Sequence, residues 1–144
     1  MGLKVELKPG ERLILGDCLV TNSSQRARLH IEGQAPILRE KDIMLPTQAE
    51  TPAKRIYFTV QLMYTSRDPR DHHETYFTLM RDLVQAAPST WPHMTAISNH
   101  IMAGEIYKAL KSAKALIAYE KELLDHATRD ANIRRDSQKD RKSA

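Results

Sequence analysis

Three cationic side chains recur at every second position of one segment near the N-terminus. Arg26, Arg28 and His30 alternate there with apolar residues. This spacing is typical of a half-buried strand, in which alternate residues share a face and lie about 7 Å apart. Such a row can follow a phosphate backbone, because each cation displaces condensed counterions. The opposing interpretation is that neighbouring glutamates, such as Glu6 and Glu32, neutralise the row in ordinary cross-strand pairs.

The sequence offers no constellation that is typical of an enzyme or a metal site. The adjacent His72 and His73 would point about 100° apart on a helix, which suits two exposed side chains better than one shared metal. The single cysteine, Cys18, excludes an internal disulfide and a cysteine-rich zinc site, and its place in a predicted strand favours an inert core thiol. The carboxylates between Glu120 and Asp125 indicate a solvated helix face. We therefore expect no catalytic residue, no metal and no cofactor.

The first 45 residues predict a small antiparallel β module. Five short runs with strand-like patterns are separated by turn signals, and they lie at residues 3–8, 12–15, 18–21, 26–32 and 36–41. They predict one sheet or partial barrel of about five strands. Because a sheet of this size leaves edge strands that can pair with another chain, we expect a homo-oligomer.

Residues 46–128 change to helical periodicity and predict a three-helix module, so the fold class is α+β. Thr51 and Pro52 form a helix-start signal. The expected helices cover about residues 51–66, 71–87 and 94–126. The last would be roughly 50 Å long at 1.5 Å per residue, which exceeds a compact domain of this size. It either kinks near Gly104 or packs its end on another subunit.

Most of the net charge lies at the C-terminal end. The chain carries +4 in total, of which residues 129–144 contribute +3. We expect these residues to form a flexible basic tail, which either keeps the protein soluble or acts as a mobile arm that attracts phosphates. The start of the sequence lacks the apolar run of a signal peptide, and no run approaches the roughly 18 residues of a membrane span. A cytoplasmic protein that does not enter the membrane is therefore expected.

Two stretches of the sequence resemble the FlbT family of flagellar regulators. The first is LKPGER at residues 7–12, and the second joins LREKDIM at 38–44 to TPAKRIYF at 51–58 and VQLMY at 60–64. The likeness extends from Leu3 to about Ala127. It implies a repressor of flagellin synthesis that acts at the 5′ untranslated region of flagellin mRNA and promotes decay of the message, although some members activate instead. It also implies the small flagellar protein FlaF as a partner.

A second resemblance covers about the first 40 residues. GERLILGD at residues 10–17 resembles the opening hairpin of the carbon storage regulator CsrA, and LREKDI at residues 38–43 is similar to the segment that carries its RNA-binding arginine. This resemblance implies Arg39 as the RNA-binding arginine here. The CsrA family has adjacent basic residues just before the first turn, where this chain has Leu7 and Lys8. Other cations must therefore supply the missing part of that edge.

The sequence thus predicts an RNA-binding β module, with Arg39, Arg28, Arg26 and Lys8 as the candidate contacts. Binding to a single-stranded leader segment would block the ribosome and expose the message to nucleases. No aromatic residue precedes Tyr57, so base stacking within the sheet is not expected. Two alternatives remain open. Arg39 could instead pair with a carboxylate across the sheet, such as Glu6 or Glu11, and the whole chain could be a protein-interaction adaptor that affects RNA only indirectly.

Overall fold

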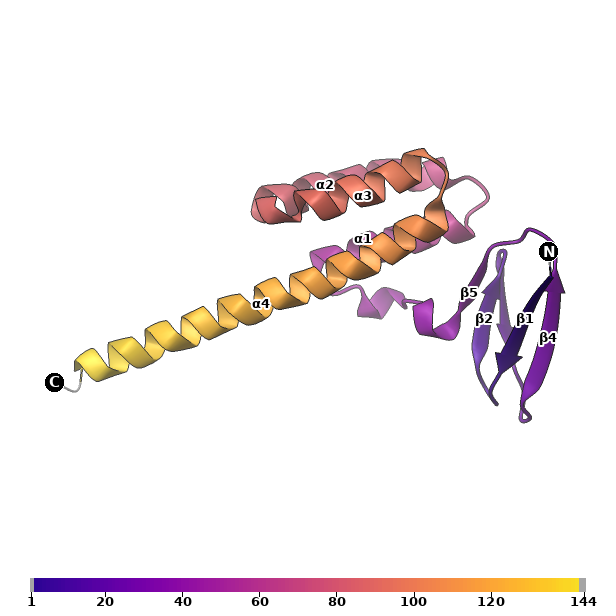
Figure 1. The fold of residues 1–144 in the computed structure, drawn as a ribbon, viewed down its shortest axis with the longest axis horizontal. Coiled ribbons are helices and arrows are strands. Elements are labelled where there is room, and N and C mark those ends of the chain that lie inside the picture. Colours follow the sequence, from indigo (N-terminus) through magenta and orange to yellow (C-terminus); the bar gives the residue numbers. More distant parts are fainter. Residues whose placement is uncertain (1, 143–144) are drawn as a thin grey trace.

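The computed structural model describes residues 2–142, which fold into a β module followed by a helical module (Figure 1). The strands are β1 (Gly2–Leu7), β2 (Arg12–Leu15), β3 (Cys18–Thr21), β4 (Ala27–Glu32) and β5 (Ile37–Arg39). All pairings are antiparallel, and the α+β class is confirmed. The strands do not form one sheet, however. They divide into a two-stranded sheet, β1-β4, and a three-stranded sheet, β3-β2-β5.

Asn22 fixes the place where the chain passes between the two sheets. Its side-chain amide donates to the carbonyl oxygens of Leu7, Lys8 and Gln25 at 3.2, 2.9 and 2.8 Å. This amide therefore ties the end of β1 to the segment that leads into β4. β1 pairs with β4 along its whole length, with Gly2 opposite Glu32 and Leu7 opposite Ala27.

The three-stranded sheet has apolar side chains on both faces. Leu13 is fully buried in a small core with Val5 and Leu7 of β1. Ile14, the next residue in sequence, points the other way, and so does Leu38, which lies opposite Ile14 on β5. Both pack into the larger core of the helical module. This sheet is therefore the layer through which the β1-β4 sheet is attached to the helices.

The helical module contains four α-helices rather than the three predicted. They are α1 (Pro52–Thr65), α2 (His73–Ala86), α3 (Trp91–Met102) and α4 (Ile106–Lys142), and the short 3₁₀ helices are η1 (Glu40–Asp42), η2 (Pro46–Gln48), η3 (Pro69–His72) and η4 (Pro88–Thr90). The predicted third helix is broken at Gly104, which has φ +77°. Glu105 N donates to the carbonyl of His100, and Gly104 N to that of Ile101, which is the hydrogen-bond pattern that ends a helix at a glycine.

The C-terminal part of α4 projects beyond the other helices (Figure 1). Each residue from Leu124 to Ile133 is exposed. The helix continues to Lys142 through the segment predicted as a tail, while residues 143 and 144 lie outside the described part. Asp125 and Asp130 each precede an arginine by four positions, a spacing that supports a helix in water. The flexibility of this segment stays a prediction. Among the described helices, none is both long and apolar enough to span a membrane.

Candidate nucleic-acid interface

The four predicted RNA-binding residues lie on three different parts of the β module. Arg26 and Arg28 belong to the β1-β4 sheet, with Arg26 just before β4, whereas Arg39 ends β5 in the other sheet. Lys8 lies in the turn after β1. All four side chains are exposed. The structure therefore leaves each of them accessible, but it does not gather them into one site.

The outer face of the β1-β4 sheet carries the row of alternating cations that the sequence predicted. Lys4 lies opposite His30, and Glu6 lies opposite Arg28. Glu6 also contacts Arg26, with 3.4 Å between Arg26 Nη1 and Glu6 Oε1. His30 Nδ1 lies 3.9 Å from a Glu32 carboxylate oxygen. This outer face is consequently a mixed surface, in which carboxylates partly neutralise the cations.

Polar side chains of α1 hold β5 and the linker that follows it by hydrogen bonds to their backbone. Gln61 accepts from Met44 N at 2.7 Å and donates to Met44 O at 3.0 Å. The Tyr64 hydroxyl accepts from Ile37 N at 3.2 Å and lies 3.1 Å from Ile37 O. The Tyr57 hydroxyl donates to Asp42 O at 2.5 Å. These three residues face the linker because they lie four and seven positions apart on one helix.

The surroundings of the two tyrosine hydroxyls raise their pKa. Burial raises the pKa of Tyr57 above its ordinary value, and the negative charge of Asp42 adds to the effect. Burial also raises the pKa of Tyr64. A tyrosine of ordinary pKa is already protonated at physiological pH, so the raised pKa values extend this state to higher pH. Both phenols therefore hold the segment from Ile37 to Met44 against α1 as hydrogen-bond donors.

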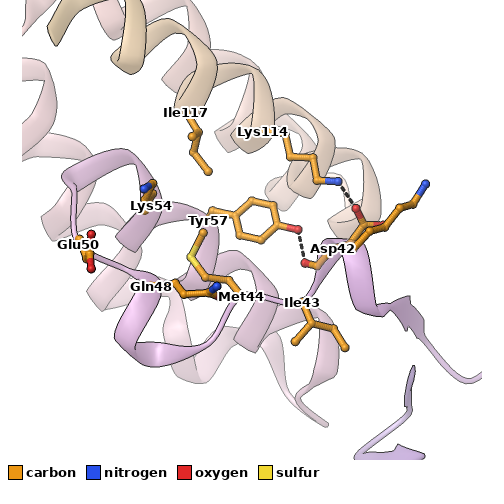
Figure 2. Close-up of a pocket in the computed structure, with 10 residues that line it drawn as sticks. Asp42, Ile43, Met44, Gln48, Glu50, Lys54, Tyr57, Lys114 and Ile117 are labelled. Atoms are coloured by element: carbon orange, nitrogen blue, oxygen red, sulfur yellow. Dashed lines mark hydrogen bonds and ion pairs between the residues drawn. The ribbon is translucent and has the colours of Figure 1, made fainter. Parts of the chain in front are cut away.

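The helix α4 also contacts this linker. Lys114 forms an ion pair with the carboxylate of Asp42, and Figure 2 shows this pair beside the hydrogen bond from Tyr57. The linker is therefore fixed to two helices at Asp42, by its backbone to α1 and by its side chain to α4. This arrangement determines where the neighbouring Arg39 and Lys41 stand.

Glu120 locks the two helices together, which corrects its assignment to a solvated face. Its side chain is buried, and its Oε2 accepts from Ala53 N at 2.9 Å. Thr51 Oγ1 accepts from Lys54 N at 3.2 Å. Because Pro52 has no N–H, these bonds satisfy the first free donors of α1. A carboxylate also suits the positive end of the helix dipole.

A trough runs between the linker and α4, which we call the junction trough. It consists of three adjoining cavities of about 370, 230 and 370 Å³ that share lining residues. The cavity nearest β5 is lined by Arg39, Lys41, Tyr64 and Tyr107, among others. Lys111 and Lys114 line the middle cavity. The last cavity has an apolar side with Ile43, Met44 and Ile117, together with Lys54 and Glu50 (Figure 2).

The junction trough is the more cationic of the two surfaces. Its five basic side chains, Arg39, Lys41, Lys54, Lys111 and Lys114, face the two carboxylates of Asp42 and Glu50. Within residues 2–142, Arg39, Lys41 and Lys54 have no ion pair in the structure. The alternative in which Arg39 pairs with a carboxylate across the sheet is therefore not what the structure shows.

Aromatic rings reach this surface from the helical module. The rings of Tyr64 and Tyr107 have their centroids 5.8 Å apart, and Lys111 Nζ lies 5.0 Å from the centroid of Tyr107. The sheet itself contains no aromatic residue, as the sequence indicated, but α1 and α4 place two tyrosines beside Arg39. Cations combined with exposed aromatic rings form the usual surface for single-stranded nucleic acid.

Among the described residues, no group of three or more His, Cys, Asp or Glu side chains could hold a metal ion. Cys18 is exposed rather than buried as predicted, because it lies on β3, an edge strand of its sheet. Its Sγ is 3.6 Å from a carboxylate oxygen of Asp17.

Comparison with known proteins places the chain in a family. Residues 3–124 match the family model described as flagellar protein FlbT. A "probable flagellum biosynthesis repressor protein FlbT 1" from Bradyrhizobium diazoefficiens is 58% identical over 124 residues, which cover 85% of each chain. A "probable flagellum biosynthesis repressor protein FlbT" from Rhodopseudomonas palustris is 47% identical over 86% of this chain and 98% of its own length.

A more distant relative, the "flagellum biosynthesis repressor protein FlbT" of Caulobacter vibrioides, is 40% identical over 131 residues, or 89% of this chain and 93% of its own. No solved structure matches the chain. The resemblance of the N-terminal segment to CsrA stays a prediction. The match to the family model and the extent of these likenesses together show that the chain belongs to the FlbT family.

Proposed function

We propose that this protein represses flagellin synthesis after transcription by binding a single-stranded segment of the flagellin mRNA leader in the junction trough. The names of the relatives support a repressor of flagellum biosynthesis. The RNA part rests on one cavity in which Arg39 and Lys41, which have no ion pair among the described residues, lie with the exposed ring of Tyr107. Such a cavity offers both charge for phosphates and a flat surface for bases.

The trough assigns different roles to its cations. Lys41, Lys111 and Lys114 line it as point charges that suit phosphates, whereas the planar fork of Arg39 can engage two acceptors on a base edge. Bound protein blocks ribosome access and leaves the message to cellular nucleases. The protein itself contributes no catalytic residue to that decay and needs no cofactor. The site of action is the cytoplasm, where the message is translated.

Filter binding of the purified full-length chain tests this proposal. The leader RNA and a shuffled RNA of equal length and composition are compared across a salt series. We expect binding of both at low salt, a preference for the leader, and a linear fall of log affinity with log salt. The leader should stay intact until a nuclease is added. Absence of leader binding at low salt, or cleavage of naked leader that one His or Glu substitution abolishes, contradicts the proposal.

An adaptor function is the second candidate, and the projecting end of α4 favours it. Leu124 and Ile133 are 54% and 63% exposed on a helix segment that has no neighbour among the described residues. A protein partner that covers these apolar side chains would stabilise the projecting segment. FlaF, which the family resemblance implies, is the partner to test first.

Truncation after Thr128 separates the two functions. If the chain acts through RNA, the truncated protein should bind all RNAs more weakly by a similar factor, because it loses only general positive charge. The leader preference and repression in cells should persist. Loss of repression with unchanged leader binding, together with loss of FlaF binding, would instead support the adaptor.

A further inference from the structure

Tyr107 occupies the entrance of the junction trough at the first turn of α4. Its side chain is 44% exposed, and it lines the same cavity as Arg39 and Lys41. Exposed tyrosines are common, so exposure alone assigns no role. This ring is distinguished by its position beside two cations that form no ion pair within the described part of the chain.

Neighbouring groups hold the ring of Tyr107 in place. Its centroid lies 5.8 Å from that of Tyr64, at an angle of 42°. Tyr64 is itself fixed, because its hydroxyl lies within hydrogen-bond distance of both backbone polar atoms of Ile37. A ring positioned in this way loses little conformational freedom when a ligand packs on it.

Lys111 occupies the neighbourhood of the ring in the unbound structure, with its Nζ 5.0 Å from the ring centroid. An exposed cation–π contact of this kind corresponds to a roughly 2- to 5-fold effect on an equilibrium. Stacking of a nucleobase on an aromatic side chain corresponds to roughly 5- to 150-fold. A base can therefore displace the ammonium group, which then becomes available to the adjoining phosphate.

We propose that Tyr107 is the stacking platform for one unpaired base of single-stranded RNA, bound at the Arg39 end of the junction trough. This inference rests on the proposed function and names the subsite that would read the strand. A base on Tyr107 lies in the cavity that Arg39 also lines, so its edge is available to the guanidinium. A duplex does not fit this subsite, because its bases are already stacked on one another.

The test combines protein variants with abasic RNA. A short single-stranded leader oligonucleotide is prepared in versions that each lack one base, and affinities are measured for the full-length wild type, Tyr107→Phe, Tyr107→Leu and Tyr107→Ala. We expect Tyr107→Phe to bind within about twofold of wild type, and the Leu and Ala variants to lose roughly tenfold or more. One abasic position should cost the wild type a similar factor and cost Tyr107→Ala nothing further, as expected for a coupled pair.

Trp91→Ala serves as the matched control, because Trp91 is an exposed aromatic residue that does not line the trough. It should leave leader affinity unchanged. Circular dichroism and thermal melting verify that each variant is folded. Wild-type affinity that is insensitive to every abasic position overturns the inference, and so does tight binding by folded Tyr107→Ala. If either result is found but leader binding still depends on Arg39, the proposed function is retained and only the role of Tyr107 is rejected. If the wild-type protein does not bind the leader at all, both the proposed function and the role of Tyr107 are rejected.

Discussion

The outer face of the β1-β4 sheet and the junction trough both present basic residues, but they differ in how those residues are surrounded. The cations of the outer face come from the regular alternation of two strands, and Glu6 and Glu32 lie among them. The cations of the trough come from β5, η1, α1 and α4, and Arg39, Lys41 and Lys54 have no ion pair within residues 2–142. Sequence spacing thus identifies charges, whereas the fold decides which of them are free.

The difference concerns specificity more than attraction. An exposed ion pair such as Arg26–Glu6 contributes only about 0–1 kcal/mol, so RNA can break it at low cost. The outer face can therefore still attract phosphates. It lacks the combination of an arginine and a positioned aromatic ring, which the trough obtains from its contacts with α1 and α4.

The largest expected effect comes from removing three cations from each surface in turn. The trough variant combines Arg39→Ala, Lys41→Ala and Lys111→Ala, and the outer-face variant combines Lys4→Ala, Arg26→Ala and Arg28→Ala. Both remove the same charge. The trough variant should lose about 100-fold or more in leader affinity together with the leader preference, because base contacts are lost with phosphate contacts.

The outer-face variant should lose roughly tenfold or less, and equally for leader and shuffled RNA, because only general attraction is removed. Filter binding across a salt series measures both affinity and salt slope. If the two variants lose leader affinity and leader preference equally, the two surfaces contribute equally to RNA binding, and the difference in their surroundings has no effect on it.

The next effect concerns Arg39 alone. Arg39→Lys keeps the charge but loses the planar fork, so we expect a loss of about 1–3 kcal/mol in leader binding and little change for unrelated RNA. The melting temperature should stay the same, because Arg39 forms no ion pair among the described residues and Glu6 and Glu11 contact other groups. Unchanged leader affinity with a lower melting temperature would indicate a structural role instead.

The sequence predicted the strands well because Pro9, Gly10, Gly16 and Gly33 separate short alternating runs. It did not predict two sheets, because β1 pairs with β4 across the intervening hairpin, and such long-range pairing leaves no local signal. It predicted the accessible cations, but it missed the trough, since Arg39 and Tyr107 line one cavity only after the linker packs against α1 and α4.

Glu120 shows which signal was available and how it was misread. It lies at a buried position of α4, where the sequence predicts a solvated face. A carboxylate at a buried position requires a partner, and that partner is the N-terminus of a helix about 70 residues earlier in the chain, at Ala53. Neither the helical periodicity of the sequence nor the charge of Glu120 identifies the helix N-terminus that this carboxylate caps.

The hydrogen bond that Glu120 accepts from Ala53 N joins α1 to α4. It therefore stabilises the helices that form the trough and makes no contact with the outer face of the β1-β4 sheet. Glu120→Ala should reduce the free energy of unfolding by about 1–3 kcal/mol, because it leaves a buried N–H without a partner. Urea unfolding measures the change. Glu122→Ala, at an exposed position on the same helix, is the control and should stay within about 0.5 kcal/mol of wild type. A similar small effect for Glu120→Ala would mean that α1 and α4 are held together by apolar packing alone.

The smallest expected effect tests the hydrogen bonds of the linker in the absence of RNA. The pKa of Tyr57 is raised in the folded protein, chiefly by burial and further by the charge of Asp42. The unfolded chain therefore releases this proton first, at about pH 10. The stabilisation is fully present below that pH and is lost as the pH rises further, with a limiting slope of about 1.4 kcal/mol per pH unit for one group.

Tyr57→Phe should accordingly have two opposite effects on the free energy of unfolding. At pH 7 it should cost about 0.5–1.5 kcal/mol, because the hydrogen bond to Asp42 O is lost. Between pH 10 and 11.5 the variant should lose stability less steeply than wild type. The free energy of unfolding of the variant still falls over this pH range, because burial also raises the pKa of Tyr76, to about 12. Urea unfolding at pH 7, 10 and 11.5 measures the three values, and parallel slopes for the two proteins would mean that Tyr57 is not buried in the linker contact.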